Sequence, residues 1–114
     1  MQPIVYGQIY WAKLKGYSSW PCMVSYFDEN SDFWRTGSRG TIEYFVEFFG
    51  VKVEYAWVTQ QKLKIYTAQE TCKGPKGLKT ATQEANSVLN KDISVKLNYF
   101  REKNLRNEEG KKHL

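Results

Sequence analysis

Five short segments rich in β-branched and aromatic residues lie within the first 66 of the 114 residues, and they limit the folds open to this chain. Glycines and polar clusters separate these segments, which is the pattern of short strands joined by turns. We expect strands at residues 8–14, 21–27, 41–49 and 53–58, and a short fifth strand at 63–66. Short strands that follow one another closely favour a small antiparallel barrel, because a sheet that closes on itself exposes no edge.

Residues 41–49 have the clearest strand pattern. Every second residue from Ile42 to Phe48 is apolar or aromatic, and this period of two is typical of an antiparallel strand with one buried face. We therefore expect Glu43 and Glu47 on the outward face, in solvent. The polar residues 28–40 before this strand predict a loop.

The pattern changes after residue 66, since residues 1–66 hold sixteen of the eighteen Phe, Trp and Tyr side chains. Apolar residues then recur at helical spacing from Leu78 to Leu89 and from Ile93 to Phe100. We expect a mainly β fold with two C-terminal helices packed on the barrel. The prediction is one domain over residues 1–104, with the barrel at about 5–66, the helices within 67–104 and a frayed basic tail at 105–114.

The net charge of +5 comes mainly from the second part of the chain, because residues 67–114 carry ten Lys and Arg against six Asp and Glu. No apolar run is long enough to cross a membrane, and no signal peptide precedes the first strand. We therefore expect a soluble, intracellular and monomeric protein with no membrane partner.

Residues that would support catalysis or metal binding are sparse. Cys22 and Cys72 are not part of a CxxC pair and His113 is the single histidine, so we expect neither a zinc site nor a disulfide framework. Ser18 and Ser19 have no evident His–Asp partner, and the chain has no glycine-rich phosphate motif. We expect no enzyme activity, no metal and no cofactor.

Tyr17 and Trp20 stand three residues apart, just before the apolar run of residues 21–24. We expect a tight arch that enters a buried strand, with both rings at its rim. Phe48 ends the third strand shortly before Gly50, so the three rings can meet at one mouth of the barrel. A box of aromatic faces suits a soft, poorly hydrated cation, such as a methylated lysine, through cation–π attraction.

The alternative interpretation of these rings is that they fill the core of a small barrel. We expect that role for Trp11 and Trp57, which lie inside strands, and we leave the role of Trp34 in the polar loop open. Basic residues add a second candidate surface, with two lysines next to the arch and three at the start of the first expected helix. Exposed lysines there could meet phosphates, and they are Lys13, Lys15, Lys73, Lys76 and Lys79.

The chain resembles the PWWP domain of chromatin proteins from about Val5 to Phe100. The resemblance is carried by residues 5–13, 16–23, 43–50 and 56–58. The Tyr-x-Val-x-Phe-Phe-Gly and Ala-Trp-Val pieces look most similar to the PWWP domains of the SET-domain methyltransferases that bind nuclear receptors. Two features depart from the family pattern: the name-giving tetrapeptide reads Ser-Ser-Trp-Pro at 18–21, with its first two positions replaced, and Val51 stands where many members have an acidic residue.

This resemblance implies an SH3-like, Tudor-type barrel in a nuclear protein that regulates transcription. It implies a reader of histone H3 di- or trimethylated at its lysine-36, with Tyr17, Trp20 and Phe48 as the methyl-lysine cage. Nucleosomal double-stranded DNA is the implied second ligand, bound without sequence preference at the lysines named above. Glu47 and Glu54 are candidates for contacts with basic histone residues, and the parent protein would be a chromatin enzyme such as a histone methyltransferase.

Two other functions stay open at this point. The first is an SH3-like interaction module whose aromatic mouth takes an unmodified or proline-rich peptide. The second is a domain that binds duplex DNA alone, with a vestigial cage. A preference for methylated over unmodified peptide separates the reader from both.

Overall fold

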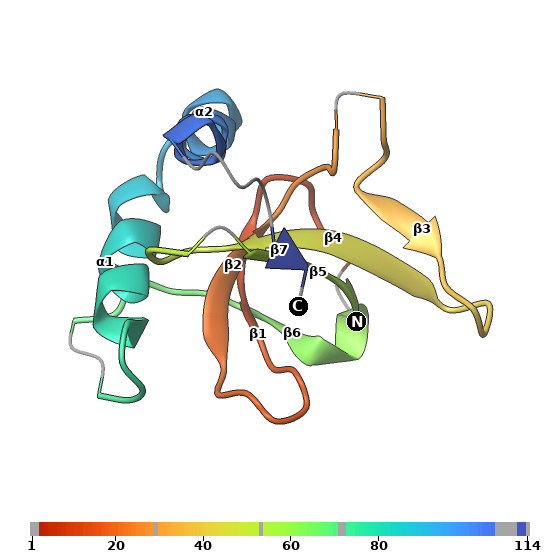
Figure 1. The fold of residues 1–114 in the computed structure, drawn as a ribbon, viewed down its shortest axis with the longest axis horizontal. Helices are drawn as coiled ribbons and strands as arrows, with labels where there is room; N and C mark the ends of the chain where they lie inside the picture. Colours follow the sequence, from red (N-terminus) through yellow and green to blue (C-terminus); the bar gives the residue numbers. More distant parts are fainter. Residues whose placement is uncertain (1–2, 29, 53, 71–72, 107–111, 114) are drawn as a thin grey trace.

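The computed structural model describes residues 3–28, 30–52, 54–70, 73–106 and 112–113, which form a bent β-sheet with two helices beside it (Figure 1). The elements in chain order are β1 (Ile9–Ala12), β2 (Trp20–Val24), β3 (Trp34–Thr36), β4 (Ile42–Phe48), β5 (Glu54–Thr59), the 3₁₀ helix η1 (Gln60–Lys62), β6 (Leu63–Ile65), α1 (Leu78–Val88), α2 (Ile93–Arg106) and β7 (Lys112–His113).

The five predicted strands are present and lie in the order β6-β1-β2-β4-β5, with each pair antiparallel. The chain returns from β5 through η1 to β6, which pairs with β1 on the other side of the sheet. Within the described residues this order is an open path, so the sheet is bent rather than closed by a ladder of hydrogen bonds. The prediction of a mainly β fold followed by two helices is confirmed.

The inner face of the sheet forms one hydrophobic core. Its register brings Cys22 opposite both Tyr10 and Phe48, so neighbouring strands contribute side chains to the same layer. The buried members of this inner core are Tyr10, Ala12, Cys22, Val24, Val46, Phe48, Ala56, Val58 and Leu63.

The two helices cover part of the outer face and form a second core. Ala81 and Ala85 on α1 have no exposed surface, and their small side chains let the helix lie close to β2 (Figure 1). Neither described helix is long and apolar enough to cross a membrane. The buried members of this outer core are Ile9, Met23, Phe49, Tyr66, Ala81, Ala85, Val88 and Phe100.

The second core overturns one prediction for β4. Its C-terminal half is buried on both faces, and Glu47 is only 5% exposed instead of lying in solvent. Glu47 pairs with Met23 of the outer core. The alternating sequence pattern therefore predicted the direction of the side chains in β4. It did not predict that a second hydrophobic core covers the outer face.

A strand also forms where we predicted a loop. β3 pairs with the first half of β4, and Arg35 forms an ion pair with Glu43 at 2.9 Å. The chain reverses between them in a tight turn, in which the Gly37 N–H donates to the Thr41 carbonyl at 2.7 Å. All three β3 residues are exposed, so no buried face marked this strand in the sequence.

The C-terminal end differs from the predicted frayed tail. α2 continues to Arg106, two residues past the predicted domain end, and Lys112–His113 pairs in parallel with β5. β5 offers an edge beyond β4, and an edge strand is a ready template for pairing. Cys72 and residues 107–111, which earlier predictions also concerned, lie outside the described residues.

Candidate ligand-binding site

The arch between β1 and β2 is a tight turn, as predicted. The Tyr17 N–H donates to the Leu14 carbonyl at 3.0 Å, and Gly16 has a φ of 84°, which favours glycine. The Lys13 ammonium donates to the Leu14 carbonyl at 3.1 Å and also to the Tyr17 carbonyl. This arrangement leaves the Tyr17 side chain 57% exposed at the rim of the arch.

The structure brings the three predicted cage residues together around one pocket of about 870 Å³. Tyr17 is exposed, Trp20 is partly buried and Phe48 is 4% exposed. The three lining residues therefore differ in exposure, from the exposed Tyr17 to the almost fully buried Phe48. The rest of its lining comes from the arch, from the turn after β4, from Glu54 at the start of β5 and from residues 75–77 before α1.

Trp20 is fixed in this pocket by its indole nitrogen and by two glycines. Its Nε1–H donates to the Phe49 carbonyl at 2.8 Å. A Cβ placed on Gly77 would lie 3.5 Å from the Trp20 ring, and one on Gly50 would lie 3.7 Å from it. The indole is therefore held between the turn after β4 and the loop before α1.

The predicted DNA-binding lysines flank this pocket on two sides. Lys13 and Lys15 are exposed at the arch, and Lys73, Lys76 and Lys79 are exposed before and at the start of α1. Of these five, Lys76 lines the pocket itself.

The two candidate acidic residues end up on different sides of the sheet. Glu54 lines the pocket. Glu47 is buried beside Met23 and Tyr55 and is not part of the lining. The suggestion that Glu47 contacts a histone residue at this pocket is wrong, because adjacent residues of a strand point to opposite faces and Phe48 takes the pocket side.

Sequence reasoning missed some of the lining residues. Lys52 lies in the turn after β4 and lines the pocket together with Lys76, and Pro75 and Gly77 close it from the loop before α1. Lys52 lies two residues after the Phe-Phe-Gly piece, and this closeness was the available signal in the sequence. The contribution of the loop before α1 depends on how the helix packs and has no local pattern.

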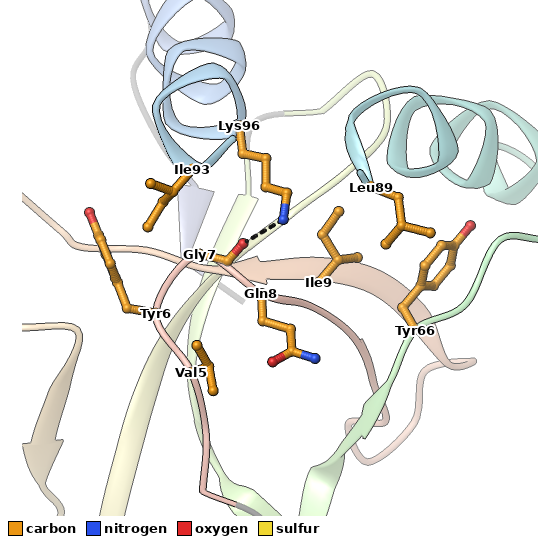
Figure 2. Close-up of a pocket in the computed structure, with 9 residues that line it drawn as sticks. All are labelled: Val5, Tyr6, Gly7, Gln8, Ile9, Tyr66, Leu89, Ile93 and Lys96. Carbon is orange, nitrogen blue, oxygen red and sulfur yellow. Dashed lines mark hydrogen bonds between the residues drawn. The ribbon is translucent and has the colours of Figure 1, made fainter. Parts of the chain in front are cut away.

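Figure 2 shows a different pocket, between the start of α2 and the residues before β1. Its volume is about 320 Å³, and none of the predicted site residues lines it. The Lys96 ammonium donates to the Gly7 carbonyl at 3.3 Å across this pocket, and burial lowers the pKa of Lys96. This contact ties α2 to the first turn of the sheet.

The three other tryptophans lie outside the 870 Å³ pocket. Trp11 packs against the outer core, with its ring 5.0 Å from that of Tyr66. Trp57 is partly buried, and the Arg35 guanidinium lies 4.3 Å from the centre of its ring. Trp34, whose role was open, is 43% exposed on β3.

The bent sheet carries an aromatic pocket, a basic arch borders this pocket, and two helices pack against the sheet. This arrangement defines a small binding module. The chain belongs to the PWWP domain family, whose model matches residues 7–108. This family consists of chromatin reader and DNA-binding modules, and its members bind histone tails and DNA. The resemblance found in the sequence is confirmed.

Two curated relatives come from different kinds of protein. The chain is 32% identical over 95 residues to DNA mismatch repair protein Msh6 of Homo sapiens, which covers 75% of this chain and 7% of that protein. It is 36% identical over 64 residues to histone-lysine N-methyltransferase NSD3 of Mus musculus, which covers 56% of this chain and 4% of that protein. The chain thus spans less than a tenth of the length of either relative.

A solved structure supports the fold. The solution structure of the second PWWP domain of WHSC1L1 protein matches 90% of this chain and 90% of its own length, with a TM-score of 0.52 and 22% identity. At this identity the match shows the shared fold alone.

Proposed function

We propose that this domain reads histone H3 methylated at its lysine-36, in the di- or trimethyl state, and binds nucleosomal DNA at the same time. The observation that carries the proposal is the single pocket lined by Tyr17, Trp20 and Phe48. We also propose that the domain only binds ligands and catalyses no reaction, and that it is part of a larger nuclear chromatin protein. The short span of its matches within Msh6 and NSD3 supports a larger parent.

The aromatic lining favours a methylated ammonium over a plain one. Each methyl group spreads the positive charge and weakens its hydration, and an aromatic face contributes about 0.5–2 kcal/mol to binding such a cation. Glu54 adds a negative charge to the lining. Because a flexible tail loses conformational freedom on binding, the peptide alone should bind weakly.

DNA supplies the second contact in this proposal. An ammonium group has three donors, and Lys13 uses two of them on the arch carbonyls, so one remains for a phosphate. Lys15, Lys73, Lys76 and Lys79 are exposed on either side of the pocket. Simultaneous binding of tail and DNA raises the effective concentration of each, so a weak pocket can still select methylated nucleosomes.

The first test compares peptides. Methylated and unmodified H3 tail peptides are titrated by calorimetry against the parent chain and against Trp20→Ala and Trp34→Ala. Trp34 is the matched control, because it is an exposed tryptophan outside the pocket. We expect about tenfold tighter binding of the methylated peptide, lost in Trp20→Ala and kept in Trp34→Ala, since about 1.4 kcal/mol corresponds to a factor of ten.

Equal binding of the two peptides by the parent chain would reject the reader function. Such a result would favour the module for unmodified peptide. An absence of any peptide binding, with DNA still bound, would favour the domain that binds DNA alone.

A further inference from the structure

The turn after β4 is held by charged side chains from both helices. The Phe48 carbonyl accepts a hydrogen bond from the Lys103 ammonium of α2 at 3.0 Å. Two residues further on, the Gly50 N–H donates to Glu84 Oε2 of α1 at 2.9 Å. The positive charge from α2 therefore meets a backbone carbonyl, and the negative charge from α1 meets a backbone N–H two residues further on.

Tyr99 of α2 links these two contacts. Its hydroxyl donates to Glu84 Oε2, and the Lys103 ammonium lies 5.9 Å from the centre of its ring. Lys103 is only 8% exposed. Hydrogen bonds that involve an ionised group are short and strong, and burial makes the loss of one partner more damaging to the group left behind.

The middle residue of the turn is held from a third direction. The Phe49 carbonyl accepts the indole N–H of Trp20 at 2.8 Å. Trp20 itself lines the pocket, so the turn and this pocket wall fix each other. Gly50 adopts a φ of 118°, which a glycine reaches without strain but side-chain-bearing residues rarely adopt, and in this conformation its N–H donates to Glu84.

We propose that Glu84 and Lys103 are positioning residues for the pocket. Through the Phe48 carbonyl and the Gly50 N–H they hold the end of β4, which carries the Phe48 ring, and the turn after it, so the ligand meets a site that is already formed. Preorganisation of this kind raises affinity by removing the cost of ordering the site during binding. The inference rests on the proposed methyl-lysine function, because it concerns the affinity of the same pocket.

The test uses two substitutions that remove the contacts and one that preserves a contact. Lys103→Met and Glu84→Leu remove the charged group, and Lys103→Arg keeps a cationic donor at the same place. Val88→Ala is the control for stability, since Val88 is buried in the outer core but neither lines the pocket nor bonds to the turn. All variants are first shown to be folded by circular dichroism at the titration temperature.

Two quantities are measured on the full chain. The first is the Gly50 amide proton, whose NMR shift and hydrogen exchange in the free protein report the bond to Glu84 without any ligand. The second is the affinity for the methylated H3 peptide. We expect Glu84→Leu to move the Gly50 amide signal upfield and speed its exchange, and we expect both removing variants to weaken peptide binding at least fivefold. Lys103→Arg and Val88→Ala should stay within twofold of the parent.

The outcomes that oppose the inference are distinct from those that oppose the proposed function. Selective binding by the parent chain, together with unchanged affinity in Lys103→Met and Glu84→Leu, would overturn the positioning role alone. Affinity that falls equally in Val88→Ala would also overturn it, because stability would then be the cause. Equal binding of methylated and unmodified peptide by the parent would reject the proposed function and, with it, this inference, before any variant is compared.

Discussion

At the scale of single residues, Trp20 connects the chemistry of the pocket with its shape. Its ring lines the pocket while its indole N–H holds the Phe49 carbonyl. Phenylalanine at this position would keep an aromatic face but leave that carbonyl without its donor. This double role explains why the aromatic residue at this place is a tryptophan, whereas Phe48 needs only its ring.

Cys22 provides a prediction at the same scale. Its thiol has no exposed surface in the inner core, and burial raises its pKa well above the ordinary value. Because the thiolate is the reactive form, the raised pKa keeps the thiol protonated and unreactive at neutral pH. We expect iodoacetamide to label Cys22 at least 100-fold more slowly in the native protein than in the protein unfolded with guanidinium. Peptide-resolved mass spectrometry measures this rate, and rapid native labelling would show that the inner core opens.

At the scale of elements, α1 lies against β2 because the helix presents small residues there. Ala85 has no exposed surface, whereas Gln83 on the same helix is exposed. We expect Ala85→Leu to lower the free energy of unfolding by about 1–3 kcal/mol, because extra methylene groups in a packed core force the helix outwards. Gln83→Leu should change it by less than about 0.5 kcal/mol. Denaturant titration measures both, and equal effects would contradict the close packing of α1.

The elements that sequence reasoning predicted are those with a local pattern. The five strands of the sheet have runs of β-branched and aromatic residues, and both helices have apolar residues at helical spacing. β3 escaped prediction because its three residues are exposed, and its cross-strand partners, such as Glu43 opposite Arg35, lie several residues further along the chain. The burial of Glu47 depends on the second hydrophobic layer, which no pattern within β4 indicates.

Some residues of the candidate site were also predictable from the sequence, and others were not. Tyr17, Trp20 and Phe48 were predictable as neighbours, because the arch before β2 and the end of β4 place these residues at one pocket of the sheet. Glu84 and Lys103 were not predictable, since they lie 34 and 55 residues from the backbone groups they hold. In the sequence they look like ordinary charges on the solvent face of a helix, and only the packing of the helices reveals their role.

At the scale of the whole molecule, the pocket and the lysines face one composite partner in the proposed function. The arch contributes Lys13 and Lys15, the loop before α1 contributes Lys76, and the pocket lies between them. Three to five phosphate contacts would give a slope of about −2.7 to −4.5 for log affinity against log salt. The salt-dependent part would come from DNA and the methylation-dependent part from the pocket, so the two can be measured separately.

The most direct test is the affinity of this chain for reconstituted mononucleosomes with and without trimethylation at lysine-36 of histone H3, measured with the parent chain and Trp20→Ala. The account predicts that the parent binds the methylated nucleosome at least fivefold more tightly, and that Trp20→Ala binds both nucleosomes with the affinity of the parent for the unmodified one. Equal affinity of the parent for the two nucleosomes would contradict it.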